Sequence, residues 1–338
     1  MKNTKRFLVI AVMAIVVVSL CATMFMSCDQ EQDISIYLVP DKAEYTVGVC
    51  QLVQHVALDA ATQGFVDALT EEMEAAGKKV TIDIQNASGD PAICSTIANK
   101  FVSSKYDLIM ANATPALQAA ANATLTIPVL GTSITEYGTA LGVKDFKGTL
   151  GNNISGTSDC APLDKQADMI FELIPTAKKV GILYCSSEAN SKYQVEQVEK
   201  FIKQNHKDVT IVKKSFSDTN DLASVVSSFV GAVDAVYIPT DNTCANNAAS
   251  INAILEPARI PVIAGEEGIA KGCGVATLSI SYYDLGKVTG HMAAQILLGK
   301  NVALMPIEYA SSTTYEYVAS RCTALGITVP ENYVAINE

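Results

Sequence analysis

The chain contains the same succession of short apolar strands and helices twice, at a nearly constant spacing. Val47–Val49 corresponds to Val180–Ile182, and Ile127–Val129 corresponds to Ile260–Val262; both pairs are 133 residues apart (180 − 47 and 260 − 127). Short apolar strands that alternate with helices are typical of parallel sheets covered by helices on both faces. The sequence therefore predicts an α/β protein with two doubly wound parallel-sheet lobes.

The expected elements can be placed along both copies. The first copy predicts strands over 45–53, 79–87, 106–113 and 127–133, with helices over 57–77, 91–104 and 114–123. The second copy predicts strands over 178–186, 210–217, 233–242 and 260–267, with helices over 189–204, 220–233 and 244–256. Ligands of such sheets bind at the edge where strands end and helices begin. We therefore expect a polar cleft between the two edges.

The N-terminal segment predicts export. Lys2, Lys5 and Arg6 precede an apolar run from Phe7 to Leu20, which is typical of a secretory signal. The stretch that ends at Cys28 resembles a bacterial lipobox. We expect residues 1–27 to be a signal peptide and Cys28 to be lipidated at the outer face of the membrane. Plain secretion and an uncleaved anchor helix are the alternatives.

Charge and cysteine content narrow the class of protein further. The net charge of −11 becomes −14 (−11 − 3) without the signal segment, and no basic run is present. This composition argues against nucleic acid and an anionic-lipid surface as partners. Seven scattered cysteines remain in the body, an odd number that favours buried free thiols over a disulfide framework. They are Cys50, Cys94, Cys160, Cys185, Cys244, Cys273 and Cys322.

Two adjacent carboxylates, Glu266 and Glu267, follow the last strand of the second copy. A metal site is not expected, because the three histidines are isolated from other ligands. An enzyme is not expected either, because neighbouring residues on a strand point to opposite faces and no nucleophile or phosphate-loop motif occurs. We also expect no cofactor. A cationic ligand remains, and a zwitterionic amino acid fits the polar loops best.

The residues lead to a specific arrangement for that ligand. We predict that Asp241 and one of Glu266 and Glu267, with Glu267 favoured, contact the ammonium group. Hydroxyl and N–H groups around Thr114, Ser133, Ser158 and Ser187 would contact the carboxylate. Structural alternatives stay open: Asp241, Ser187 and Thr114 could cap helices, and His55 could be structural.

Motifs over almost the whole mature chain carry a family resemblance. They include VGVCQLVQHVALDAATQGFVDAL, GNNISGTSD, VGILYCSSEANS, VDAVYIPTDNT and IPVIAGEEG. The chain resembles ABC transporter substrate-binding lipoproteins of the tryptophan/tyrosine type. The resemblance implies a type I periplasmic-binding-protein fold, an aromatic amino acid as ligand, and delivery of that ligand to an ABC permease. A monomer is expected. A nucleoside, a sugar or another amino acid as ligand, and an exported hydrolase, are the alternatives.

The resemblance also implies ligand-binding positions and a hinge. The implied positions are Gln51, His55, Thr114, Thr132, Ser133, Thr157, Ser158, Ser187, Glu188, Asn190, Thr240, Asp241, Asn242 and Glu267. Val56 stands where the family usually has Pro, which puts the role of His55 in doubt. Candidates for an aromatic wall are Tyr137, Tyr184, Tyr282 and Tyr283.

The fold implies three chain crossings between the lobes. We expect them near 156–159, 279–283 and 311–317. A tether over 28–44 would then precede lobe 1, formed by 45–156 with 283–311, and lobe 2, formed by 157–282 with 312–338.

Overall fold

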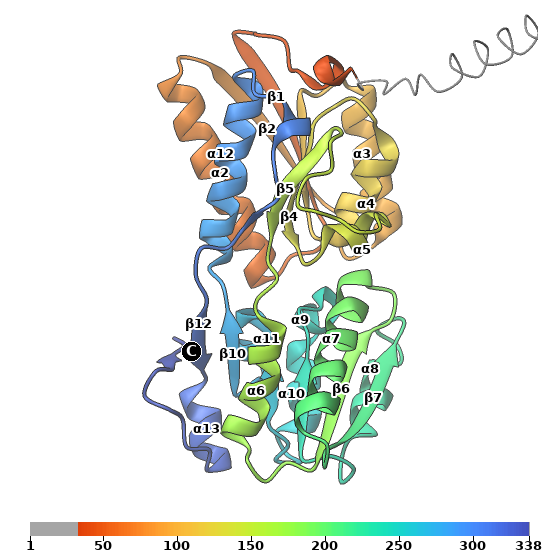
Figure 1. Cartoon of the computed structure of the whole chain (residues 1–338), viewed down its shortest axis with the longest axis vertical. Helices are drawn as coiled ribbons and strands as arrows, with labels where there is room; N and C mark the ends of the chain where they lie inside the picture. The colour runs from red at the N-terminus through yellow and green to blue at the C-terminus, as the bar shows by residue number, and fades with distance from the viewer. Residues whose placement is uncertain (1–32, 338) are drawn as a thin grey trace, which may run out of the picture. The chain divides into compact units, whose positions relative to one another are not determined.

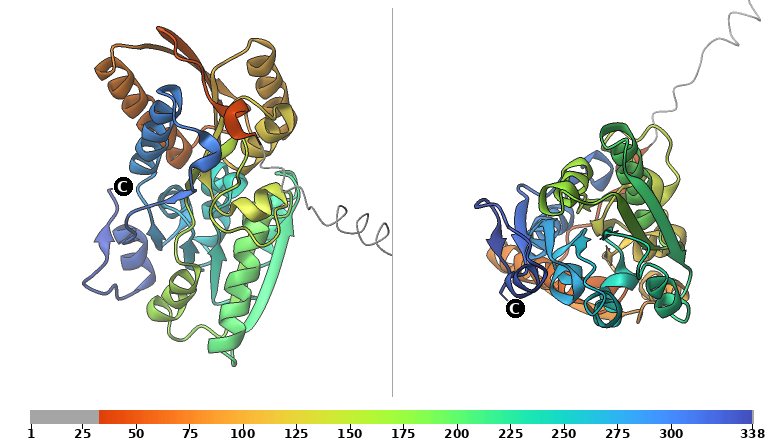
Figure 2. Two further views of the ribbon diagram at one scale, coloured as in Figure 1. Left: turned by 45° about the horizontal axis from the view of Figure 1, so that its top comes forward. Right: turned by 90° about the horizontal axis from the view of Figure 1, so that it is seen from below.

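The structure is a computed structural model that describes residues 33–337. The expected signal peptide, the lipidation site Cys28 and the first part of the tether lie outside the described residues. Two sheets, each with helices on both faces, make up this part of the chain (Figures 1 and 2). No helix among residues 33–337 is long and apolar enough to cross a membrane.

The first sheet is parallel throughout, with the order β11-β5-β4-β3-β1-β2. Its strands are β1 (Glu44–Gln51), β2 (Lys79–Asn86), β3 (Leu108–Asn112), β4 (Val129–Ile134), β5 (Ile154–Ser158) and β11 (Glu308–Tyr309). Its helices are α2 (Val56–Ala75), α3 (Pro91–Ser103), α4 (Thr114–Ala123), α5 (Tyr137–Leu141) and α12 (Tyr282–Leu297), with short 3-10 turns η1 (Ile34–Tyr37) and η2 (Val302–Leu304).

The second sheet has the order β13-β12-β10-β9-β8-β6-β7. Its strands are β6 (Lys179–Cys185), β7 (Thr210–Phe216), β8 (Ala235–Ile238), β9 (Val262–Ala264), β10 (Ala276–Ser279), β12 (Thr314–Tyr317) and β13 (Val334–Ala335). Its helices are α6 (Leu163–Leu173), α7 (Ala189–Asn205), α8 (Leu222–Ser227), α9 (Asn242–Asn246), α10 (Ala248–Leu255), α11 (Glu267–Cys273) and α13 (Ala319–Leu325). The pairing of β12 with β10 is antiparallel and departs from the parallel pattern.

The two sheets repeat one topology. The run β2-β1-β3-β4-β5 in the first sheet corresponds to β7-β6-β8-β9-β10 in the second. In both runs the strand order reverses direction at the first strand, which creates a switch point at the carboxyl edge of the sheet. The predicted pair of doubly wound α/β lobes is therefore confirmed.

The chain passes between the two sheets three times. It leaves the first sheet after β5, returns between β10 and α12, and leaves again between β11 and β12. β5 continues to Ser158, so the first passage begins at Asp159. The exact lobe boundaries that the sequence suggests stay a prediction.

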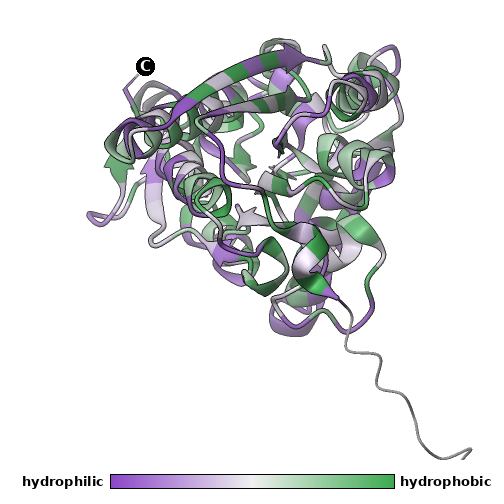
Figure 3. Cartoon of the chain, turned by 90° about the horizontal axis from the view of Figure 1, so that it is seen from above, coloured by the Kyte–Doolittle hydropathy of each residue, from purple (hydrophilic) through white to green (hydrophobic). Residues whose placement is uncertain are grey.

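Each sheet has an apolar cluster on both faces. On β1, Val49 packs on the α2 and α12 side, whereas its neighbour Cys50 packs on the α3 and α4 side. This alternation follows from the two-residue period of a strand. The helices carry both apolar and polar residues along their length (Figure 3). No disulfide joins the seven body cysteines in the part of the chain that the structure describes, and six of them are buried.

Helices α2 and α12 lie side by side although most of the chain separates them (Figure 1). Glycine makes this close contact feasible. A Cβ at Gly286 would lie 2.0 Å from the carbonyl oxygen of Ala61, and one at Gly64 would lie 2.0 Å from that of Tyr283. Because of this packing, α12, which follows the second passage, belongs to the first lobe.

Two helices of the second copy differ from the sequence prediction. The helix expected over 220–233 is only α8, because the Ser227 and Ser228 hydroxyls donate to carbonyl groups of the preceding turn and Gly231 then takes a left-handed conformation (φ 72°). The helix expected over 244–256 is two helices separated at Asn247, and it starts earlier because Asp241 caps α9.

Candidate ligand-binding site

A small polar chamber lies where strands of both sheets end. Each residue that lines it stands at the end of a parallel strand or in the segment that follows that strand. The lining residues are His55, Leu58, Ser133, Thr135, Asp159, Asn190, Thr240, Asp241, Asn242, Ala245, Glu266 and Tyr282. None of them is Lys or Arg. The chamber therefore contains three carboxyl groups and no permanent cation.

Four buried polar atoms of this chamber have no hydrogen-bond partner among the described residues. They are His55 Nδ1, Ser133 Oγ, Asp159 Oδ1 and Asn190 Oδ1. Buried polar atoms are almost always paired, so an unpaired group calls for an explanation. Four such atoms around one chamber indicate a site built for a polar ligand.

Ser133 is held in an unusual conformation at the end of β4. Its backbone φ is +55°, in the left-handed region that residues other than glycine seldom adopt. Beneath it, the hydroxyl groups of Thr132, Thr157 and Thr289 form a buried cluster with O–O distances of 2.8–3.2 Å. Strained residues tend to occur at ligand sites. We infer that Thr132 and Thr157 position the end of β4 rather than contact a ligand.

Asp159 is the carboxylate with an open oxygen. Its Oδ2 accepts a hydrogen bond of 3.0 Å from the Tyr282 hydroxyl, whereas Oδ1 has no partner. Burial raises the pKa of Asp159 to about 6 and the charge of Glu266 acts in the same direction, whereas the hydroxyl groups of Tyr282 and Thr135 lower it. A cation beside Oδ1 would stabilise the ionised form and lower this pKa.

Asp241, by contrast, has its oxygens occupied by protein donors. Oδ2 accepts from Cys185 N (2.7 Å) and Ser191 Oγ (2.8 Å), and Oδ1 accepts from Cys244 N (2.8 Å). Burial and the neighbouring Glu188 raise the pKa of Asp241. Asp241 is therefore the N-cap of α9, as the structural alternative in the sequence analysis allowed.

Glu188 joins two helices instead of pointing at a ligand. Its carboxylate accepts hydrogen bonds from Asn190 Nδ2, from the backbone and side chain of Asn242, and from those of Thr243, at 2.7–3.1 Å. Five donors leave little capacity for another partner. Glu188 therefore fixes the start of α9 against the start of α7.

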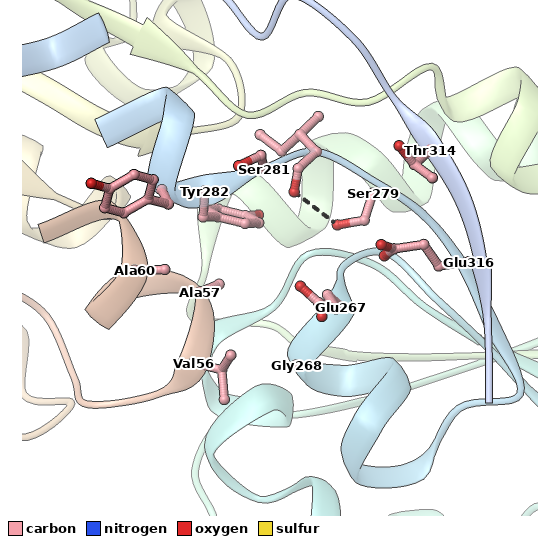
Figure 4. Close-up of a pocket in the computed structure, with 12 residues that line it drawn as sticks. Val56, Ala57, Ala60, Glu267, Gly268, Ser279, Ser281, Tyr282, Thr314 and Glu316 are labelled. Atoms are coloured by element: carbon pink, nitrogen blue, oxygen red, sulfur yellow. Dashed lines mark hydrogen bonds between the residues drawn. The ribbon is translucent and has the colours of Figure 1, made fainter. Parts of the chain in front are cut away.

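Glu266 and Glu267 face different cavities. Glu266 lines the chamber and caps α11, accepting from the N–H groups of Gly268 and Ile269. Its pKa is raised by burial. Glu267 lines a separate cavity of about 280 Å³ (Figure 4), which we call the hinge cavity. Its carboxylate forms an ion pair of 2.7 Å with Lys271. The preference for Glu267 over Glu266 as a chamber residue has no support in this geometry.

The structure brings together six of the fourteen predicted site residues. His55, Ser133, Asn190, Thr240, Asp241 and Asn242 line the chamber. Ser187 and Glu188 lie instead at an outer cavity of about 490 Å³, and Gln51, Thr132 and Thr157 are buried in hydrogen-bond networks behind the chamber. Thr114 and Ser158 are buried outside the chamber lining.

The cap interpretations of two hydroxyl residues are wrong. Thr114 is the first residue of α4, and Ala113, whose φ is +86°, precedes it at the cap position. Ser187 precedes Glu188, which occupies the cap position of α7. The Ser187 hydroxyl instead lies 2.9 Å from Cys185 Sγ.

The sequence analysis missed four chamber residues, although Leu58 and Asp159 lie inside motifs that it quotes. Leu58, Thr135, Asp159 and Ala245 were not named as ligand positions. Asp159 had one available signal, since it directly follows a buried strand at the sheet edge.

Of the four aromatic candidates, Tyr282 lines the chamber. Tyr137 is fully buried and donates to the carbonyl of Gly131, and Tyr184 packs in the core of the second lobe. Tyr283 donates to Asp67 and lines the hinge cavity.

Two α/β lobes with a polar chamber between the ends of their strands define a solute-binding protein. The family model described as "ABC transporter substrate binding protein" matches residues 46–337, and the chain belongs to this family of extracytoplasmic proteins.

Relatives of known identity agree with this membership. A "Tyrosine-binding protein" of Clostridioides difficile (strain R20291) is 39% identical over 272 residues, 80% of this chain and 78% of the relative. A Streptococcus pneumoniae ABC domain in complex with L-Trp is 33% identical, with a TM-score of 0.81 over 87% of this chain and 100% of the other. A ligand-free, open substrate-binding protein with adhesive properties from Clostridium difficile is 38% identical, with a TM-score of 0.67 over 87% and 99%. The fold is that of the two-lobed type I periplasmic binding proteins.

Proposed function

We propose that the protein captures a zwitterionic aromatic amino acid in the chamber and presents it, unchanged, to an ABC permease. The observation that carries this proposal is the free Oδ1 of Asp159, buried in a chamber without Lys or Arg. A buried carboxylate requires a cationic or donor partner. The ammonium group of an amino acid supplies both the charge and three N–H donors.

The remaining unpaired atoms suit the rest of the ligand. Asn190 Oδ1 is a second acceptor for the ammonium, since Asn190 Nδ2 already donates to Glu188 and to the carbonyl of Thr240. The Ser133 hydroxyl is a donor for the ligand carboxylate. Neutral donors are sufficient there, because the ligand carries its own compensating charge.

Binding requires the lobes to separate and then to close around the ligand less completely than in the present arrangement. The chamber has a volume of about 10 Å³, room for roughly one water molecule. His55 Nε2, after β1, lies 3.3 Å from Asn242 Oδ1, after β8, so a contact joins the two lobes across the chamber. The TM-score is higher to the L-Trp complex than to the open relative, which is closer in sequence. This supports a closed arrangement and hinge motion during capture.

The proposal includes ligand class and location. The tyrosine-binding relative and the L-Trp complex support an aromatic amino acid, and the lipobox-like sequence before Cys28 supports a lipid anchor. We propose a monomer without cofactor, metal or catalysis.

Isothermal titration with the twenty amino acids tests the proposal. Tyrosine, tryptophan or phenylalanine should bind, whereas an aryl propionate, which lacks the ammonium, should bind at least about 10-fold more weakly. Recovery of the bound amino acid without any product, measured by mass spectrometry, should accompany binding. Equal affinity for the amino acid and its des-amino analogue would overturn the ammonium site, and product formation would overturn a binding-only role.

A further inference from the structure

The hinge cavity is formed jointly by both lobes and by two of the three chain passages. Val56, Ala57 and Ala60 of α2 contribute from the first lobe. Glu267 and Gly268 of α11 contribute from the second. Ser279–Tyr282, along the second passage, and Thr314 and Glu316, which directly follow the third, complete it. A cavity with these walls changes whenever the lobes move.

Two carboxylates point into this cavity with little compensation. Figure 4 shows Glu267 and Glu316 directed at the same space, with the small side chains of α2 on the other side. Glu267 is paired with Lys271. Glu316 Oε2 is buried and has no partner among the described residues.

Other neighbours of Glu316 bring no charge. On β10 the residue opposite is Thr277, and on β13 it is Val334. Tyr282 and Tyr283 are the other titratable residues that line the cavity. Lys271 on α11 is the cation that acts on Glu316.

We propose that Glu316, together with Glu267, opposes closure of the lobes, so that the ligand-free protein is held open until a ligand provides the closing free energy. Closure narrows the cavity between α2 and Glu316, so that the ionised carboxylate loses water while Val56, Ala57 and Ala60 offer no side-chain donor. A buried unpaired charge is unfavourable. When Glu316 is protonated, this opposition disappears. The proposal deepens the proposed function, because it concerns the regulation of that same site.

The sign of the pH dependence follows from the closed arrangement. Burial, and then the charge of Glu267, raise the pKa of Glu316 to about 7, and Lys271 lowers it. Opening the lobes widens the cavity, gives Glu316 more access to water and lowers its pKa. Closure therefore takes up a proton, so that the closed form is favoured as pH falls through 7 and disfavoured above it.

Small-angle scattering of the ligand-free protein tests this inference independently of any ligand. The native protein should be more compact at pH 6 than at pH 8, whereas Glu316→Gln should be as compact at pH 8 as at pH 6. Glu308→Gln, an exposed glutamate on β11 beside the third passage, is the matched control and should behave like the native protein. No difference between Glu316→Gln and the control at pH 8 would overturn the inference.

Titration with the amino acid that binds most tightly gives a second test, in which one variant should increase the affinity and another should decrease it. At pH 8, Glu316→Gln should bind at least about threefold more tightly than the native protein, because a larger fraction of the protein is competent to close. Lys271→Met, which leaves both carboxylates uncompensated, should bind more weakly. At pH 6 the ratio between Glu316→Gln and native should approach one. Unchanged affinity of Glu316→Gln at pH 8 would refute the mechanism, whereas failure of every amino acid to bind the native protein would refute only the proposed function.

Discussion

The hydroxyl group of Tyr282 donates a 3.0 Å hydrogen bond to Asp159 Oδ2. Asp159 is the first residue of the first passage between the sheets, and Tyr282 is the first residue of α12, the helix that follows the second passage. One hydrogen bond thus joins two hinge segments at the wall of the chamber. A ligand that engages Asp159 acts directly on the part of the molecule that bends.

Replacing Asp159 should weaken ligand binding without unfolding the protein. A hydrogen bond to a charged group contributes about 1.5–3 kcal/mol, so Asp159→Asn should raise Kd about 10- to 200-fold. Because burial disfavours the ionised form of Asp159 in the ligand-free protein, the variant should also unfold at an equal or higher urea concentration at pH 7.5. Asp164→Asn, exposed on α6, is the control for both measurements. Native affinity in Asp159→Asn would place the ammonium elsewhere.

Ligand affinity should fall in acid. The ammonium requires ionised Asp159, whose pKa in the ligand-free protein is about 6, and the bound ammonium lowers that pKa. Binding therefore releases a proton below pH 6, and affinity is lost as pH falls through this value. In Glu316→Gln, which lacks the separate effect of that carboxylate on closure, titrations in a pH series should give a constant Kd above about pH 7 and a rise approaching tenfold per pH unit in acid, on the relation between pKa and free energy. The same series on Asp159→Asn should be flatter.

Asp241 should matter for stability more than for ligand recognition. Asp241→Ala leaves the N–H groups of Cys185 and Cys244 and the hydroxyl of Ser191 without their acceptor. Unpaired buried donors are destabilising by about 1–3 kcal/mol each, less where water enters. Urea unfolding should show a loss of this order. A variant as stable as the native protein, but unable to bind amino acids, would restore Asp241 as a ligand contact.

The contact between α2 and α12 should not tolerate a methyl group. In Gly286→Ala the new Cβ would lie 2.0 Å from the carbonyl oxygen of Ala61, and overpacking of this kind costs about 1–3 kcal/mol. The gain in helix propensity is only about 1 kcal/mol, so the net effect should be a lower urea midpoint. Ser95→Ala, at an exposed position of α3, should leave the midpoint unchanged or raise it. If Gly286→Ala is as stable as the native protein, α2 and α12 can move apart to admit the methyl group without loss of stability.

The fold could be predicted because its signal is periodic and occurs twice. The apolar strands over 127–133 and 260–267 sit at equivalent places in the two copies, and the observed β4 and β9 fall inside or next to them. The strands β11 and β13 have two residues each, too few to show a period. Their places depend on tertiary pairing with β5 and β12.

The site could be predicted only to the level of loops. Topology places the ends of β1, β4, β5, β6, β8, β9 and β10 around the chamber. Hydrogen bonding decides which side chains at these ends are left without a protein partner. Asp241 and Asp159 both follow strands, and the sequence alone favoured Asp241. The difference is that Asp241 finds donors at the start of α9 whereas Asp159 Oδ1 finds none, a fact that exists only in three dimensions.

Helix starts explain the excess of acid around the chamber. Asp241 caps α9 and Glu266 caps α11, so each of these carboxylates meets the partial positive charge of free N–H groups at a helix end. Asp159 is followed by a helix whose cap position is Pro162, and it receives no such field. Of the three carboxylates of the chamber, Asp159 is therefore the one that no helix start helps to stabilise in its ionised form. In the proposed complex the ammonium group of the ligand takes the place that a helix start has beside the other two carboxylates, and the carboxylate of the same ligand keeps the net charge of the chamber unchanged.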